Sequence, residues 1–194
     1  MSKTGLLALA VLLAPAYAFA VDGQTLINQS TVTAAGGFPY TISQPGSYKL
    51  SGNLSVPVTA TGIIVTASNV TLDLNGFSIM SVDASTSSLL VQTVGAVKAF
   101  TIRNGTLSVA SPNSTLIITD SASSTVAEDL NLVQLSGAGS VFFGSSSIIR
   151  RVSYPGGFIH VTCPGLLVDS LAAHYVLGGT ANTCAIGFLA GAIP

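Results

Sequence analysis

The stretch Gly62-Ile63-Ile64-Val65, followed by Asn69-Val70-Thr71-Leu72-Asp73-Leu74, decides the fold prediction. Each part is a short run of β-branched and aliphatic residues bounded by Gly, Ser or Asn, and such runs are typical of β-strands. Similar runs recur, for example at Phe100-Thr101-Ile102 and Phe158-Ile159-His160-Val161. Helical spacing with a charged outer face appears nowhere, and only Leu167 to Tyr175 is a candidate for a short helix. The sequence therefore predicts an all-β chain.

The strand runs repeat in two interleaved series. The first series begins at Val70, Phe100, Val126, Ile148 and Leu166, with spacings of 30, 26, 22 and 18 residues. The second series begins at Ile63, Leu89, Leu116, Val141 and Phe158, with spacings of 26, 27, 25 and 17 residues. Each period holds at least two short strands and two turns, which is the content of one coil of a parallel β-solenoid. An immunoglobulin-like sandwich would not show two offset series that shorten together, so we predict a solenoid of about five coils.

Aligning the first series on its opening residues places a charge three positions later in every coil. These residues are Asp73, Arg103, Asp129, Arg151 and Asp169, so the sign alternates along the column. Stacked coils lie about 4.8 Å apart, which predicts a ladder of opposite charges in contact. One position earlier, Glu128 and Arg150 repeat the pairing. The ladder either fixes the stacking register or forms a sugar-binding face. The first role is favoured, because alternating charges neutralise one another along the column.

The composition excludes several classes of protein. Only 7% of the residues are charged, against roughly 25% in ordinary soluble domains. The net charge of -1 gives no basic footprint, so nucleic acid is not an expected partner. A chain that is 48% hydrophobic is also unlike classical disordered proteins.

The first twenty residues have the three-part layout of a secretory signal peptide. Lys3 is the basic start, Leu6 to Leu13 is the apolar run, and Ala18-Phe19-Ala20 is the cleavage motif. The alternative, a retained membrane anchor, is disfavoured because this run is too short to span a bilayer core of roughly 30 Å. We therefore predict a signal peptide at residues 1–20, export to the periplasm, cell surface or medium, and no transmembrane segment afterwards.

Residues 21–194 are predicted to form a single domain, closed at both ends. Residues 24–45 are expected to fold over the first coil as an N-terminal cap. Residues 178–194 are apolar and uncharged at their end, so they are expected either to cap the last coil or to contact a neighbouring molecule. Cys163 and Cys184 are 21 residues apart, close to one late coil, and should form a disulfide in an oxidising compartment.

Residues 41–79 resemble the opening coils of secreted right-handed parallel β-helix proteins of the pectin-lyase-like superfamily. The resemblance rests on Thr41 to Leu54 and on the two strand runs at 62–65 and 69–79, and it recurs at Phe100 to Leu107. Beyond Ser123 only the strand rhythm remains. The resemblance implies a three-sheet prism with stacked aliphatic residues inside. It implies little about activity, because the superfamily spans lyases, hydrolases, adhesins, phage spikes and inert stalks.

The sequence shows few of the catalytic and metal-binding residues of the superfamily's enzymes. Similar pectate lyases bind calcium through clustered carboxylates, and similar polygalacturonases use three nearby Asp residues. Here the acids are spread singly, and the one adjacent pair, Glu128-Asp129, should point to opposite faces of its strand. His160 and His174 have no acid or Cys at ligand spacing, so no metal or cofactor is predicted. The sequence leaves catalysis open and favours its absence.

Two functions follow from these patterns. The first is a secreted structural β-solenoid that builds a surface or extracellular matrix by self-association, as a homo-oligomer or filament. The alternative is a carbohydrate-binding or carbohydrate-active β-helix protein whose partner is a polysaccharide. Its ligand-binding residues would be Asp129, Arg151, Asp169 and Tyr154. Tyr154 opens a Pro-Gly turn, so its ring is either an exposed platform for a sugar or packs over the turn between coils.

Overall fold

The computed structural model describes residues 23–57, 59–81, 89–112, 114–119, 122–178 and 184–187. Of these described residues, 63% are in strands and 4% in a helix. The predicted signal peptide, at residues 1–20, lies outside the described residues, as do residues 179–183 and 188–194 of the predicted C-terminal segment. Within the described part, no helix is long and apolar enough to cross a membrane.

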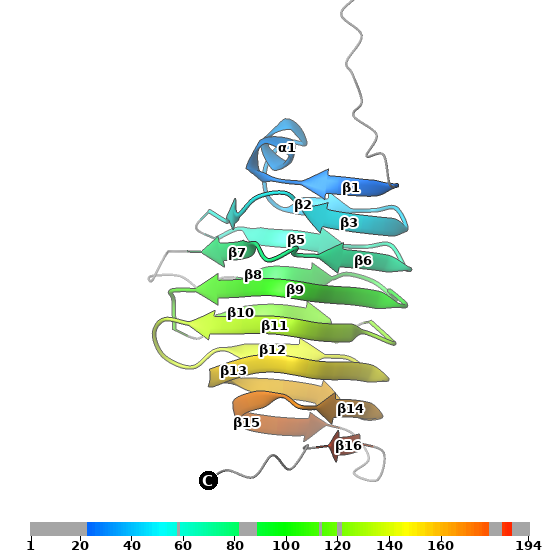
Figure 1. Cartoon of the computed structure of the whole chain (residues 1–194), viewed down its shortest axis with the longest axis vertical. Coiled ribbons are helices and arrows are strands. Elements are labelled where there is room, and N and C mark those ends of the chain that lie inside the picture. Colours follow the sequence, from blue (N-terminus) through cyan, green and yellow to red (C-terminus); the bar gives the residue numbers. More distant parts are fainter. Residues whose placement is uncertain are drawn as a thin grey trace, which may run out of the picture.

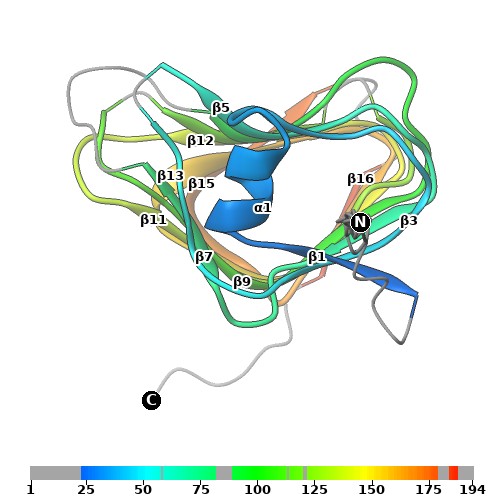
Figure 2. The same cartoon turned by 90° about the horizontal axis from the view of Figure 1, so that it is seen from above.

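The strands pair in parallel and curl round one axis, forming a ring with three sides (Figures 1 and 2). The first side stacks β1 (Gln24–Ile27), β3 (Gly46–Leu50), β6 (Val70–Asp73), the starts of β9 (Phe100–Val109), β11 (Val126–Gln134) and β13 (Ser147–Thr162), β14 (Gly165–Val168) and β16 (Cys184–Gly187). The second side stacks β4 (Leu54–Ser55), β7 (Ser78–Ser81), the later parts of β9 and β11, the middle of β13 and the start of β15 (Leu171–Gly178).

The third side completes the ring. It stacks β2 (Tyr40–Ile42), β5 (Thr61–Val65), β8 (Leu89–Thr93), β10 (Thr115–Thr119), β12 (Ser140–Phe143) and the ends of β13 and β15. The all-β prediction and the parallel β-helix arrangement are confirmed. The register extends the predicted first series in both directions, because Gly46 pairs with Val70 and Ala185 pairs with Leu166. The stretch Leu167 to Tyr175 falls in β14 and β15, so the short helix considered there is wrong.

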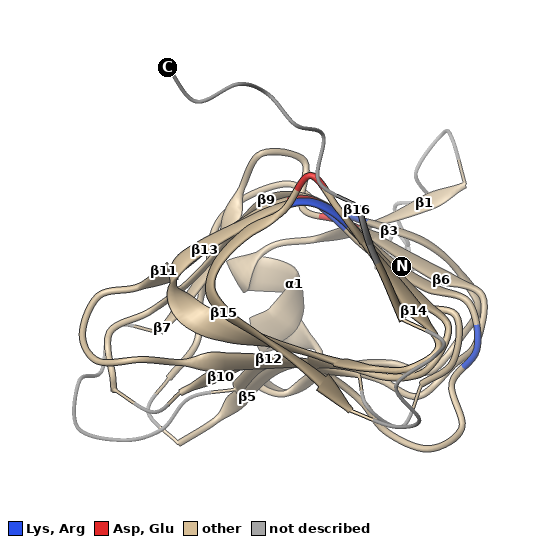
Figure 3. Ribbon diagram, turned by 90° about the horizontal axis from the view of Figure 1, so that it is seen from below, with Lys and Arg blue, Asp and Glu red and all other residues tan. Residues whose placement is uncertain are grey.

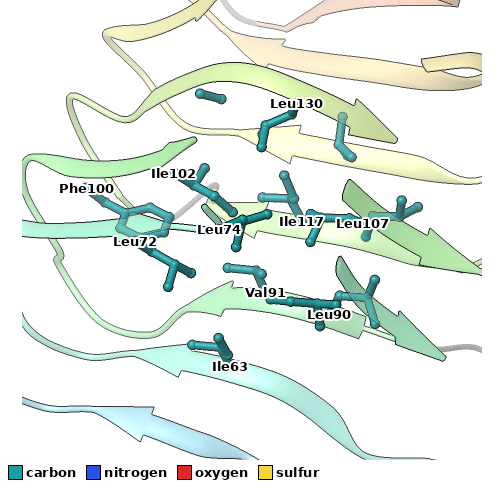
Figure 4. Close-up of a cluster of buried hydrophobic side chains, with 14 of the residues drawn as sticks. Ile63, Leu72, Leu74, Leu90, Val91, Phe100, Ile102, Leu107, Ile117 and Leu130 are labelled. Atoms are coloured by element: carbon teal, nitrogen blue, oxygen red, sulfur yellow. The ribbon is translucent and has the colours of Figure 1, made fainter. Parts of the chain in front are cut away.

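The core consists of aliphatic and aromatic side chains stacked from one coil to the next (Figure 4). On the first side, five successive inward positions in register are at most 2% exposed: Leu72, Ile102, Ala127, Ile149 and Leu167. On the third side, Ile63, Val91, Ile117, Val141 and Ile159 form an equivalent column with no exposed surface. Burial of these columns supplies the main driving force for folding, because apolar burial stabilises by about 25 cal/mol per Å².

The chain bends between the first and second sides at residues with left-handed backbone. Asn104, Asp129, Arg151 and Asp169 have φ values of 60°, 53°, 52° and 48°. Asn and Asp tolerate this conformation better than most residues, because their short polar side chains can bond locally. The bend interrupts the alternation of the strand, so the residue before it and the residue at it need not point to opposite faces.

A helix that the sequence analysis did not predict lies at the N-terminal end. Figure 2 shows α1 (Gln29–Ala34) across the opening of the ring. Asn28 caps it: its side chain accepts a hydrogen bond from the backbone N–H of Thr31, and the Thr31 hydroxyl accepts one from the backbone N–H of Asn28. Val32 is fully buried against the core, while Gln29 and the other helical residues are exposed. A single buried residue gives no helical period, which explains why the pattern search missed it.

Candidate functional site

The charged residues gather where the first side of the ring meets the second (Figure 3). Across the first side, successive register partners are Lys49, Asp73, Arg103, Glu128 and Arg150, and their signs alternate. The predicted contacts of Asp73 with Arg103 and of Asp129 with Arg151 are present, but the predicted ladder is wrong at the step between Arg103 and Asp129. Arg103 is paired with Glu128 rather than with Asp129. The predicted members Asp129, Arg151 and Asp169 each follow that column by one residue, at the bend.

The error in the alignment originates at Thr125. Thr101 is paired with Val126, so Thr125 takes the inward position next to Phe100. The sequence alignment matched the two apolar residues, Phe100 and Val126, and was thereby displaced by one position. Thr125 is fully buried, and its hydroxyl oxygen has no hydrogen-bond partner. A polar residue in a core position therefore hid the true register, since hydrophobic patterns assume apolar core positions.

The charged residues at this corner, from Lys49 to Asp169, are called the charge stripe. Four ion pairs among its described residues link neighbouring coils. Arg103 Nε lies 3.2 Å from Asp73 Oδ2. Arg151 holds Asp129 in a bidentate contact, with distances of 2.6 Å from Nε to Oδ1 and 2.8 Å from Nη2 to Oδ2. Glu128 contacts the Arg150 guanidinium, and its Oε2 is also 3.8 Å from Arg151 Nη2.

Glu128 and Asp129 do not point to opposite faces, which corrects the prediction for this pair. Both carboxylates contact Arg151. The cause is the positive φ of Asp129, which breaks the two-residue alternation at this bend. Among the described residues, no group of three or more His, Cys, Asp or Glu side chains is placed to hold a metal ion.

The stripe is electrically neutral. It holds four basic residues (Lys49, Arg103, Arg150 and Arg151) and four acidic ones (Asp73, Glu128, Asp129 and Asp169). Lys98 is the one other charged residue in the described part of the chain. A face that recognises an acidic polysaccharide needs surplus positive charge, and this stripe carries none. Its charges instead neutralise one another between coils.

The hydrogen bonds from Arg151 hold the pKa of the Asp129 carboxyl below its ordinary value. A carboxyl group whose pKa is lower in the folded state stabilises the fold above its unfolded pKa, and this stabilisation is lost as the pH falls through the folded pKa. We expect the melting temperature to fall below about pH 4, the ordinary range of Asp. In Asp129→Asn this acid-induced fall should be smaller. Melting curves by circular dichroism between pH 2 and pH 7 would check this, and identical pH profiles would contradict it.

Replacing Arg103 with Glu should destabilise the fold by about 1 kcal/mol. The substitution would place three acids in successive coils, at Asp73, residue 103 and Glu128. Urea unfolding of the two proteins measures the difference. Lys98→Glu is the matched control, because Lys98 is exposed and lies outside the stripe. If Arg103→Glu were as stable as the wild-type protein but had lost its affinity for a polysaccharide, the stripe would be a binding face.

Tyr154 is not an exposed platform, so of the two interpretations of this residue the packed ring is confirmed. It is fully buried, and burial raises the pKa of its phenol. Its ring packs against Gly157, three residues later in β13, where an added Cβ would lie 2.1 Å from a ring carbon. The Tyr154 hydroxyl donates a hydrogen bond of 3.4 Å to Gln134 Oε1. Tyr154 therefore does not join Asp129, Arg151 and Asp169 on one surface.

A set of stacked rings on the outer face of the third side was missed by the sequence analysis. Phe142 and His160 stack with centroids 4.4 Å apart, and Phe158 and His174 stack at 4.9 Å. The planes of the two pairs are tilted by only 19° and 21°. A pyranose would need a free ring face, and these stacks use ring faces against one another. The register that brings Phe142 beside His160 could not be read from their spacing alone.

The C-terminal end of the solenoid exposes residues that occupy core positions. Leu177 is paired with Val161. Val161 is 2% exposed, whereas Leu177 is 44% exposed because no described strand covers it. Large exposed apolar side chains concentrate in the same turns, at Ile148, Leu166, Leu171, Val176 and Leu177. Only Leu26, Val94 and Leu135 are comparable elsewhere in the described residues.

The predicted disulfide is present next to this end. Cys163 and Cys184 are bonded, with their Cα atoms 5.1 Å apart. Cys163 lies just before β14, and Cys184 begins β16, the next strand of the first side. The bond therefore ties two consecutive turns, as the spacing of 21 residues predicted.

No protein-family model, curated protein or solved structure matches this chain. The functional argument therefore uses the geometry of three candidate surfaces. They are the neutral charge stripe, the stacked rings of the third side and the open C-terminal end.

Proposed function

We propose that this chain is an exported structural β-solenoid of the pectin-lyase-like type, which builds a surface or extracellular matrix by associating with itself. The observation that carries the proposal is the exposure of core positions at the C-terminal end, with Leu177 at 44% against 2% for its partner Val161. Solenoids need their terminal repeats covered to remain soluble. Contact with another copy covers such an end without further machinery.

The charge stripe supports a structural role. Its residues pair between coils and leave no net charge for a ligand. Alternating charges in register also penalise a slip of one coil, because like charges would then meet. The stripe thus stabilises one stacking register of the solenoid, which is a property that a building block requires.

Export is part of the proposal. The layout of residues 1–20 supports a signal peptide, and the Cys163–Cys184 disulfide is consistent with an oxidising compartment. The periplasm, the cell surface and the medium all satisfy this condition.

No observation favours the carbohydrate alternative. Its best aromatic candidate, Tyr154, is buried, and the stacked rings of Phe142 and His160 face each other. The alternative is therefore kept as an outcome of the experiment.

Light scattering of the purified exported chain, over a hundredfold range of concentration, tests the proposal. Self-association predicts a mass that rises with concentration in the absence of any ligand. The same samples are then passed over columns of neutral and acidic polysaccharide. A protein that stays monomeric and is retained by a polysaccharide would overturn the structural role and support the alternative.

A further inference from the structure

We infer that two copies associate through their C-terminal ends and form a closed dimer rather than an open filament. This inference rests on the proposed self-association and specifies its surface and stoichiometry. Three features of the described residues carry it: the uncovered core at one end, the strand edges that border it, and the closed opposite end.

The surface comprises the last described strands, β14, β15 and β16. Tyr175 is paired with Ile159, and Leu177 with Val161, so both occupy inward positions of the third side. Ile159 and Val161 are at most 2% exposed, whereas Tyr175 is half-buried and Leu177 is exposed. Leu171 at 60% and Val176 at 40% are paired with Ser153 and His160, so they lie on the outer face beside the rim of this end. Apolar patches of this kind mark contact sites in soluble proteins.

The open edges of β15 and β16 indicate that the molecule that binds this end is a polypeptide. Within the described residues, β15 pairs only with β13, and β16 pairs only with β14. The outer edge of each strand presents backbone N–H and C=O groups, which another strand satisfies best. A polysaccharide or a lipid surface has no matching row of amides. A second copy brings the same edge, and a two-fold axis would pair two such edges antiparallel.

Charge also fits a second copy. The charged column of the first side continues into this end as Val168 and Gly187, both uncharged. Asp169 is the one Asp, Glu, Lys or Arg among described residues 165–178 and 184–187. The pKa of the Arg151 guanidinium is raised mainly by its hydrogen bond with Asp129, and the charge of Asp169 adds to this rise. Two copies can therefore meet without bringing unpaired like charges together. A strongly charged partner would find no counter-charges here.

In the described part of the N-terminal end, β1, β2 and β4 also pair on one side only and Leu26 is 47% exposed, but the core positions Ile27, Ile42 and Leu54 are at most 1% exposed, unlike Leu177. There α1 lies across the ring, with Val32 buried beneath it and polar residues such as Gln29, Ser30 and Thr33 exposed (Figure 2). A head-to-tail filament needs both ends to bind, whereas a contact between identical ends closes at two copies. The difference between the two ends therefore sets the stoichiometry.

Site-specific cross-linking of the full exported chain tests the geometry. Ala173→Cys places a thiol on exposed β15, and Ser30→Cys places one on exposed α1. A short bismaleimide is added with the native disulfide kept oxidised. We expect covalent dimers from Ala173→Cys, none from Ser30→Cys, and no cross-link between the two variants when they are mixed. Cross-links between residues 30 and 173, or unlimited filaments, would overturn the closed dimer while leaving self-association intact.

A protein that is monomeric at every concentration would overturn both the dimer and the proposed self-association. If deletion of residues 188–194 from such a monomer then produced Ala173→Cys dimers, those residues would be the cover of this end, and the inference would be wrong.

Leu177→Lys measures the contribution of the surface itself. It should weaken dimerisation about 30-fold or more, because it buries a charge at the centre of the contact. Leu135→Lys is the matched control, since Leu135 is 68% exposed and follows β11, away from this end. Equal dissociation constants for the two folded variants would overturn the inference. If Leu177→Lys does not fold, the cross-linking result decides alone.

Discussion

Replacing Phe100 with Ala is expected to destabilise the fold by about 3 to 5 kcal/mol. Phe100 is fully buried and paired with Val70 on the first side (Figure 4). Removing the ring forfeits its apolar burial and leaves a cavity that stacked strands cannot close, because their spacing is fixed by the backbone ladder. Urea unfolding followed by circular dichroism at one strand-specific wavelength measures the loss.

Val94→Ala serves as the control for Phe100→Ala. Val94 is an apolar residue that is 45% exposed, so its truncation should change the free energy of unfolding by less than about 0.5 kcal/mol. If Phe100→Ala and Val94→Ala unfolded at the same urea concentration, the core stack would not carry the stability assigned to it.

The second large effect is expected at the disulfide. Replacing Cys163 and Cys184 together with Ser should cost about 3 kcal/mol, the value for closing a loop of this size. The loss should concentrate in the last turns, because the bond ties Cys163 to β16. Hydrogen exchange should therefore show reduced protection in β14, β15 and β16 and little change in β3 or β6.

Wild-type protein treated with reductant is the matched comparison for the Ser variant. Both should unfold at the same denaturant concentration. Mass spectrometry of the exported protein that found two free thiols would contradict this prediction.

The fold was predictable because its signal is repeated. Each coil buries alternate residues of short strands, so apolar positions such as Ile63 and Leu72 recur at coil spacing and reinforce one another. The helix α1 was not predictable in this way. It is six residues long, with Val32 as its buried residue, and a single turn over an end creates no period.

The candidate site was predictable only in part, because side-chain contacts depend on register to within one residue. The disulfide followed from a spacing close to one coil, and small errors did not matter there. The charge column was sensitive to an error of one residue. The buried Thr125 displaced the alignment by one position, and Arg103 is therefore paired with Glu128 instead of Asp129. The two alternatives for Tyr154 could not be separated, since a Pro-Gly turn does not tell whether the ring before it points inward, and its burial bears out the packed one.

Electron microscopy of the purified exported chain, at a concentration where light scattering detects association, tests the central claim most directly. We expect rods about twice the length of one solenoid, each with a contact at its middle and a helix-capped end at either tip. Single-length particles at all concentrations, decorating an added polysaccharide instead of one another, would contradict it.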